Sequence, residues 1–228
     1  TEAIASALLG LVGPGDEVLL IEPYYDSYAA CVALSGATRR VVALREDPET
    51  GRFAPDIDAI RAAVGPNTRL LLLNTPHNPT GTVFTRAELT EIAAICVEHD
   101  LIAVTDEVYE DLVFDGREHV PLGSLPGMAE RTLTISSAGK MFNCTGWKIG
   151  WMCGPAELVA AARAAKQFLT FVGGAPFQPA VAHALRHEGP WVADLRSQLQ
   201  VKRDRLVEGL SEAGFGVHPC NGTYFICV

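Results

Sequence analysis

The sequence is poor in positive charge. Among its 228 residues, 18 are lysine or arginine and 27 are aspartate or glutamate, which leaves a net charge of -9 at pH 7. Proteins that bind a phosphate backbone do so with clustered lysine and arginine. The acidic balance therefore argues against nucleic acid as a partner.

Long apolar runs are also missing. The stretch from Ala3 to Val12 is interrupted by Gly10 and followed by Gly13, Pro14 and Gly15, which makes it much shorter than the ~20 residues that a membrane span needs. No basic segment and no small-residue cleavage site precedes it, as an export signal would require. We expect neither a membrane partner nor export.

Cysteine is present without any of its usual structural patterns. The six cysteines, at positions 31, 96, 144, 153, 220 and 227, include no Cys-x-x-Cys pair. The chain is also too long and too apolar for a small disulfide-stapled scaffold. We interpret the cysteines as reduced thiols that mostly fill the core, which predicts a cytoplasmic location, and we expect no metal site.

Apolar residues make up 48% of the chain and charged residues 20%, enough to bury the core of one large domain or of one and a half. Short runs of leucine and β-branched residues alternate with longer helical patterns. This order predicts an α/β fold of three layers, α/β/α, with a mainly parallel sheet covered on both faces. The expected strands are Glu17–Ile21, Arg39–Leu44, Arg69–Leu73, Leu101–Thr105 and Thr132–Ile135, and the expected helices between them are Tyr25–Leu34, Pro55–Val64, Thr85–His99 and Glu107–Phe114.

The pattern changes after Trp151. Helices are expected at Pro155–Phe168, Pro179–His187 and Pro190–Ala213, and the last of these leads into a strand-like segment at Thr223–Val228. We expect a large domain over residues 1–188 and the beginning of a smaller α+β domain over residues 189–228. Because Thr1 stands where a methionine would begin a chain and the final strand looks unfinished, we expect the sequence to be a fragment.

Polar and aromatic residues follow the ends of four of the five expected strands. In an open parallel sheet, ligands bind beyond the carboxyl ends of the strands, so these residues are the candidates for a site. The segments are Glu22-Pro-Tyr-Tyr-Asp-Ser-Tyr28, Asn74-Thr-Pro-His-Asn-Pro-Thr-Gly81, Asp106-Glu-Val-Tyr109 and Ser136-Ser-Ala-Gly-Lys140.

These segments, in this order and spacing, resemble the class I/II aminotransferases of the fold-type I family, which depend on pyridoxal 5'-phosphate (PLP). The most specific stretch is Ser-Ser-Ala-Gly-Lys-x-Phe-x-x-Thr-Gly-Trp-Lys-x-Gly, over residues 136–150. Within that family the chain is most similar to the succinyldiaminopimelate and the kynurenine (glutamine-type) aminotransferases. The resemblance implies a homodimer with its active site between the subunits, and an amino acid and a 2-oxo acid as substrates.

PLP chemistry requires an amine that forms a Schiff base with the cofactor and then moves a proton, and Lys140 matches that lysine. A buried carboxylate keeps the pyridine nitrogen protonated, a position that Asp106 matches. Tyr109, three residues later, returns to the same face at helical spacing, and both it and Asn78 can bond the phenolic oxygen of the cofactor. Taken alone, an aspartate at the Asp106 position is more often a helix cap, and Asn78 before Pro79 is also a turn signal.

The resemblance assigns stacking on the cofactor ring to Tyr25, and it assigns the phosphate to Ser137 and Lys148. Many relatives have arginine at the Lys148 position, so here the contact is a point charge without a bidentate fork. Thr1 is expected at the helix start that cups the phosphate. In relatives, an arginine of the small domain and an N-terminal segment complete the substrate pocket, and we expect both to lie outside this chain. Three neighbours, His77, Glu107 and Cys144, are expected only to pack behind these residues.

Three other functions stay open. The same scaffold can catalyse β-elimination from cysteine conjugates, and recovery of pyridoxamine phosphate would distinguish transamination from it. Aminotransferase-like domains also serve as PLP-sensing modules of transcription regulators, in which a DNA-binding domain precedes them. A doubly wound nucleotide-binding domain is the third possibility, but no Gly-x-Gly-x-x-Gly follows the first strand.

Overall fold

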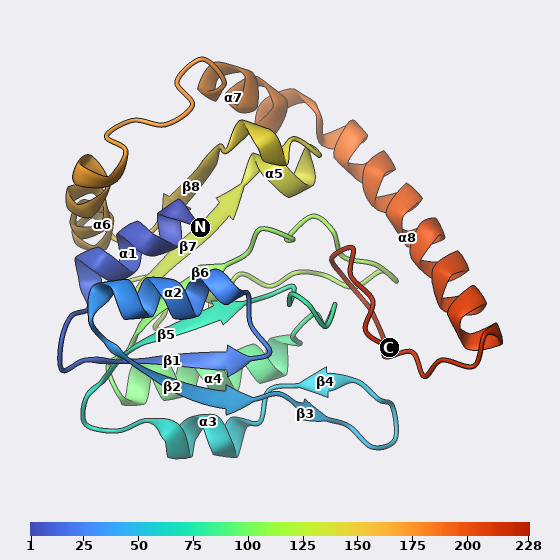
Figure 1. Cartoon of the computed structure of the whole chain (residues 1–228), viewed down its shortest axis with the longest axis horizontal. Helices are drawn as coiled ribbons and strands as arrows, with labels where there is room; N and C mark the ends of the chain where they lie inside the picture. Colours follow the sequence, from blue (N-terminus) through green and yellow to red (C-terminus); the bar gives the residue numbers. More distant parts are fainter.

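The computed structural model describes all 228 residues and has a six-stranded sheet at its centre (Figure 1). The strands lie in the order β2-β1-β5-β6-β7-β8, and every neighbouring pair is parallel except β7 and β8. A short antiparallel ribbon of β3 and β4 lies beside it. The strands of the main sheet are β1 (Glu17–Glu22), β2 (Thr38–Ala43), β5 (Thr68–Asn74), β6 (Ile102–Asp106), β7 (Thr132–Ser137) and β8 (Gly150–Cys153), and those of the ribbon are β3 (Arg45–Glu46) and β4 (Phe53–Ala54).

Helices cover both faces of the sheet, which confirms the three-layer α/β/α architecture. On one face, α3 (Ile57–Ala63) and α4 (Arg86–Glu98) bury residues such as Ile60 and Ile92 against Leu71 of β5. On the other face lie α1 (Glu2–Leu11), α2 (Asp26–Ser35) and α6 (Ala156–Leu169), which pack against the alternate side chains of the same strands. The central strand β5 is buried on both sides, as a strand between two helical layers must be.

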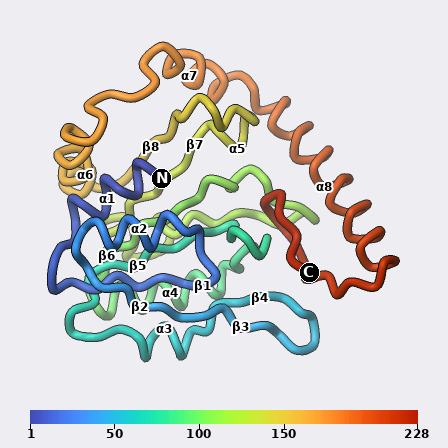
Figure 2. Tube along the Cα trace, in the orientation of Figure 1, coloured from blue at the N-terminus to red at the C-terminus, as the bar shows by residue number.

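The rest of the chain forms an arm around this core. After α5 (Ala138–Met141), β8 and α6, the helices α7 (Gln178–His187) and α8 (Gly189–Glu212) lead away from the sheet. The segment after α8 then folds back toward the loops that follow β5 and β6, as the red end of the tube shows (Figure 2). Two short 3-10 turns complete the elements, at Leu122–Ser124 and Thr145–Trp147. None of the helices combines the length and the apolar character that a membrane crossing requires.

Most expected elements are present with ends within two residues of the expected ones. The prediction of a helix over Glu107–Phe114 is wrong, because this segment is a series of turns. The side chain of Asp106 accepts a hydrogen bond from the backbone of Val108, and Leu112 donates to Tyr109 over three residues instead of four. Contacts with distant parts of the chain, including a bridge from Val113 to Gly222, override the helical pattern.

The C-terminal expectation is also wrong. Residues Thr223–Val228 form no strand, and a single bridge at Gly222 is the only β pairing there. Thr223 has a φ of 67°, which turns the chain out of the extended conformation. The antiparallel strand β8 was not expected, because its four residues Gly150–Cys153 are too short to give a periodic signal.

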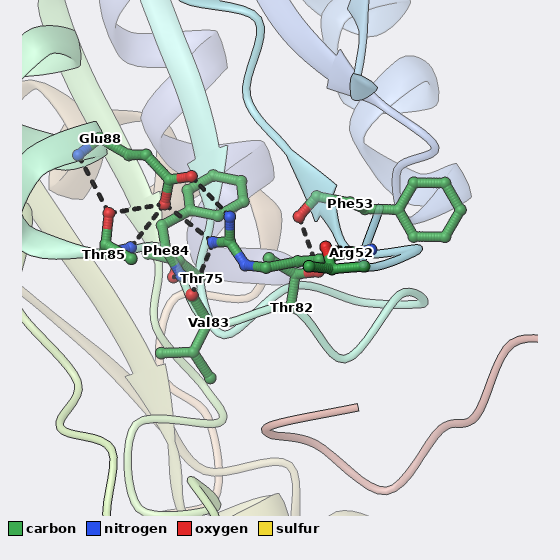
Figure 3. A network of polar contacts seen from close by, with 9 residues as sticks. Arg52, Phe53, Thr75, Thr82, Val83, Phe84, Thr85 and Glu88 are labelled. Atoms are coloured by element: carbon green, nitrogen blue, oxygen red, sulfur yellow. Dashed lines mark hydrogen bonds and ion pairs between the residues drawn. The ribbon is translucent and has the colours of Figure 1, made fainter. Parts of the chain in front are cut away.

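A polar network fixes the loop between β5 and α4. The guanidinium of Arg52 forms two hydrogen bonds with the carboxylate of Glu88, at 2.7 and 2.8 Å, and a third with the carbonyl of Val83 (Figure 3). Thr85 and Glu88 form a capping box at the start of α4. Although burial favours the neutral acid, the hydrogen bonds from Arg52 lower the pKa of Glu88. The network holds the C-terminal end of the loop that carries Asn78.

Candidate active site

The carboxyl ends of β1, β5, β6 and β7 meet at one edge of the sheet, because these strands are parallel and adjacent. In the register of the sheet, Asn74 at the end of β5 lies opposite Asp106 at the end of β6. The side chain of Asn74 reinforces this pairing, since its amide nitrogen donates to the carbonyl of Asp106 at 2.8 Å and its oxygen accepts from the backbone of Asn78 at 2.7 Å. The backbone thus places Asn78 and Asp106 in one site.

Asp106 is half-buried, and its one side-chain donor is neutral. The hydroxyl of Tyr28 donates to its Oδ2 at 2.7 Å, and the backbone N–H of Val108 approaches Oδ1 at 3.3 Å. None of the ion pairs in the chain includes Asp106. Burial raises the pKa of Asp106, while the hydrogen bond from Tyr28 acts to lower it. A cationic group would therefore find a half-buried carboxylate without an ion-pair partner here.

Lys140 lies at the carboxyl end of β7, on the short helix α5. Its Nζ is 5.8 Å from the centre of the Tyr109 ring and donates a hydrogen bond to the hydroxyl of Tyr224. Tyr109 is 2% exposed, and burial, with the Tyr224 hydroxyl beside it, raises the pKa of Tyr109. The phenol thus stays protonated near neutral pH and can donate a hydrogen bond. Tyr109 reaches this position through a turn, and not through the helical spacing expected for it.

Ser137 and Lys148 come together through the backbone of β7 and β8. Ser137 is opposite Gly150 in the antiparallel register, and the N–H of Ala138 donates to the carbonyl of Ile149 at 3.0 Å. Lys148 is exposed, has a φ of 56° and immediately precedes Ile149 in the sequence. The backbone of Lys148 is therefore one residue away from the backbone hydrogen bond at the start of α5.

Tyr25 and Thr1 lie at the border of the site. Tyr25 is 41% exposed, and its ring meets that of Tyr28 edge to face at 5.7 Å between centres. Thr1 is exposed and directly precedes α1. Tyr24, the neighbour of Tyr25, faces away and accepts a hydrogen bond from Arg39.

The three residues that were expected to pack behind the site do so. His77 is buried, with Nδ1 2.8 Å from the hydroxyl of Thr80, and burial lowers the pKa of His77 to about 4. The thiol of Cys144 donates to the carbonyl of Ala138. Glu107 is fully buried and accepts from the Thr105 hydroxyl at 2.8 Å and from Nε2 of His119 at 2.6 Å.

Glu107 and His119 also lie near Glu110, with one potential ligand atom of each within 4.8 Å of the others. Glu110 accepts a hydrogen bond from Ser136 at 2.7 Å. Because both carboxylates already have donors from the protein, we interpret the group as a hydrogen-bonded support under the turn that carries Tyr109.

Sequence reasoning missed two residues of the site, Tyr28 and Tyr224. Tyr28 had a local signal, since it stands three residues after Tyr25 and residues at that spacing share a helix face. Tyr224 had none, because its contact with Lys140 joins positions 84 residues apart.

Comparison with known proteins identifies the family. The family model for aminotransferase class I and II matches residues 1–228. The chain is 64% identical over 228 residues to the probable N-succinyldiaminopimelate aminotransferase DapC of Mycobacterium tuberculosis, which covers all of this chain and 57% of that protein. It is 40% identical over 237 residues to kynurenine–oxoglutarate transaminase 3 of the mouse, which covers 98% of this chain and 52% of that protein.

Solved structures agree with the sequence matches. N-succinyldiaminopimelate aminotransferase from Mycobacterium tuberculosis superposes with a TM-score of 0.96 at 63% identity, over 98% of this chain and 58% of that one. YbdL from Escherichia coli, described as having a methionine aminotransferase function, superposes with a TM-score of 0.92 at 38% identity, over 99% of this chain and 58% of that one. The chain thus spans a little over half the length of these relatives. It belongs to the class I and II aminotransferases, a family whose members depend on pyridoxal 5'-phosphate.

Proposed function

We propose that the protein containing this chain is a PLP-dependent aminotransferase that moves an amino group between an amino acid and a 2-oxo acid. The observation that carries the proposal is the group of side chains at the sheet edge, where the half-buried carboxylate of Asp106 accompanies the amine of Lys140 and the phenol of Tyr109. Bound PLP supplies an electrophilic carbon for the substrate amine and a ring that accepts electrons from the substrate α-carbon.

The residues present fit that cofactor. The half-buried Asp106 has no cationic side-chain partner, and a protonated ring nitrogen would provide one. Tyr109 and Asn78 are the proposed contacts of the phenolic oxygen, and Tyr25 is the proposed contact of the ring face. Ser137 at the start of α5, Lys148 and Thr1 are the proposed phosphate contacts, with hydroxyl groups and a fixed positive charge. Lys140 is the proposed point of attachment and the group that moves the proton at the substrate α-carbon.

For the substrate, we propose N-succinyldiaminopimelate with glutamate and 2-oxoglutarate as the second pair. The support is the 64% identity to the M. tuberculosis protein over the whole of this chain. A kynurenine or glutamine aminotransferase is the second candidate, favoured by the 40% identity to the mouse transaminase.

We further propose a homodimer, a cytoplasmic location and a second domain that begins at residue 189. Large apolar side chains at the end of α6 are well exposed, with Phe168 at 87% and Phe171 at 75%, as expected for a surface that a partner covers. All six cysteines are free thiols, which suits a reducing compartment. In the 24-residue helix α8 only Val192 is buried, as expected if further chain packs on it.

Two measurements on the full-length protein test the proposal. Borohydride reduction should fix the cofactor on the peptide that contains Lys140, and fixation on another lysine would refute the central assignment. A panel of amino donors should then convert the bound cofactor to pyridoxamine phosphate. We expect N-succinyldiaminopimelate or glutamate to react fastest, and faster conversion by kynurenine would favour the second candidate.

A further inference from the structure

The segment that follows α8 brings an additional phenol to Lys140. Nζ of Lys140 donates to the hydroxyl of Tyr224 and lies 5.1 Å from the centre of its ring. The Tyr224 ring meets Tyr109 nearly at a right angle, with 5.5 Å between the ring centres. The lysine amine is therefore held between two tyrosines, and one of them comes from a part of the chain with no sequence signal for the site.

The backbone around Tyr224 is attached to the two loops that carry the proposed cofactor contacts. The N–H groups of Asn221 and Gly222 both donate to the carbonyl of Gly81 at 2.9 Å. Thr223 donates to the carbonyl of Leu112 at 2.9 Å. The segment is thus fastened to the loop after β5 and to the turns after β6, and its position depends on both.

Thr223 adopts a conformation that is costly for its type of side chain. It is β-branched and fully buried, and its φ of 67° lies in the left-handed region. Its hydroxyl accepts from the N–H of Phe225 at 3.1 Å, which stabilises the bend. Backbone strain of this kind persists where the surrounding structure imposes it, and it concentrates at functional sites. Here the bend places the Tyr224 hydroxyl at Lys140.

We infer that Tyr224 is a catalytic residue that holds the amine of Lys140 whenever that amine is not attached to the cofactor; the inference rests on the proposed function. A phenol both donates and accepts. It can accept a hydrogen bond from the protonated amine of Lys140 and donate one to the neutral amine. Tyr224 can therefore hold Lys140 both before and after the amine releases its proton. A phenylalanine at position 224 would keep the packing on Tyr109 and Phe225 but could hold neither state.

The first test measures Lys140 in the full-length protein after removal of the cofactor. Wild type and Tyr224→Phe are treated with an acylating reagent at fixed pH, and the modification of Lys140 is followed by mass spectrometry relative to the exposed Lys202. We expect modification to be about twofold to tenfold faster in the variant, the range for one lost hydrogen bond. Tyr24→Phe is the matched control, because its hydroxyl bonds Arg39 away from Lys140.

The second test uses the protein with cofactor. In Tyr224→Phe we expect kcat to fall about tenfold, with cofactor affinity and KM within about twofold of wild type. The kinetic isotope effect for a substrate deuterated at the α-carbon should rise, because proton transfer then limits turnover more strongly. Wild-type values for both the labelling rate and kcat would overturn the role of Tyr224. If borohydride still fixes the cofactor on Lys140 in that case, the proposed function survives; fixation elsewhere overturns both.

Discussion

At the scale of single residues, the carboxylate of Asp106 is the charged group on which the proposed function depends most. It is half-buried, and its donors are the neutral hydroxyl of Tyr28 and a backbone N–H. Asp106→Asn keeps the shape of the side chain but removes its charge. We expect the cofactor to remain attached to Lys140 while kcat falls by about 100-fold or more, because a fixed negative charge that stabilises the reacting state is lost.

Steady-state kinetics and the cofactor stoichiometry of the full-length variant check this expectation. Asp58→Asn, an exposed substitution on α3, is the control and should leave both unchanged. Full turnover by Asp106→Asn would remove Asp106 from the proposed role.

His77 makes the stability of the protein depend on pH. Burial lowers the pKa of its imidazole from 6.5 to about 4. Between these two pH values the unfolded chain binds a proton at His77 and the folded chain does not. The contribution of the neutral His77 to stability is therefore fully present above pH 6.5 and is lost as the pH falls toward 4. The contribution is up to about 3 kcal/mol.

Urea unfolding of wild type and His77→Gln at several pH values between 7.5 and 4 measures the contribution of His77 to the free energy of unfolding. We expect the difference between the two proteins to be largest at pH 7.5 and to shrink as the pH falls. Parallel curves over the whole range would show that His77 is not responsible.

At the scale of elements, the start of α4 depends on its cap. The hydroxyl of Thr85 accepts from the N–H of Glu88, and the Glu88 side chain returns a bond to the N–H of Thr85. Thr85→Ala should lower the free energy of unfolding by about 1 kcal/mol. Thr90→Ala, on the same helix and exposed, removes a hydroxyl without removing a cap and should cost clearly less. Chemical denaturation measures the free energy of unfolding of both variants. Equal losses in the two variants would contradict a specific role of the cap.

At the scale of the whole molecule, Gly81 is the residue to which the C-terminal segment, residues 219–225, is hydrogen-bonded. A Cβ at this position would lie 2.6 Å from Sγ of Cys220 and 3.1 Å from the carbonyl of Gly222. Gly81→Ala should therefore displace the segment and take Tyr224 away from Lys140. We expect faster amide hydrogen exchange in residues 219–225 and a loss of turnover, with protection of β5 and β6 retained.

The control for this substitution is Gly116→Ala. Gly116 has a φ of 66°, close to the 69° of Gly81, but a Cβ there would meet nothing within 4 Å. Both variants carry the same backbone cost, about 1 kcal/mol, and only Gly81→Ala carries the clash. Equal exchange in the two variants would show that the clash does not control the segment.

The sequence by itself determined the layers, the strands and the residues at the strand ends. These features are local: buried parallel strands are continuous apolar runs, and ligand-binding residues follow them directly. Asp106 and Lys140 follow two adjacent strands, so their place at one edge was predictable once a parallel sheet was expected, whereas the turn that carries Tyr109 was not. The specific motif around Lys140 added the identity of the family.

Only the tertiary structure decided which distant segments meet. Glu107–Phe114 turns instead of forming a helix because Val113, Leu112 and Phe114 bond residues 221–223. The pairing of Tyr28 with Asp106 spans 78 residues and that of Tyr224 with Lys140 spans 84. No local pattern encodes such contacts, because they depend on where the sheet and the returning arm place two side chains, and that position is set by the packing of the whole chain.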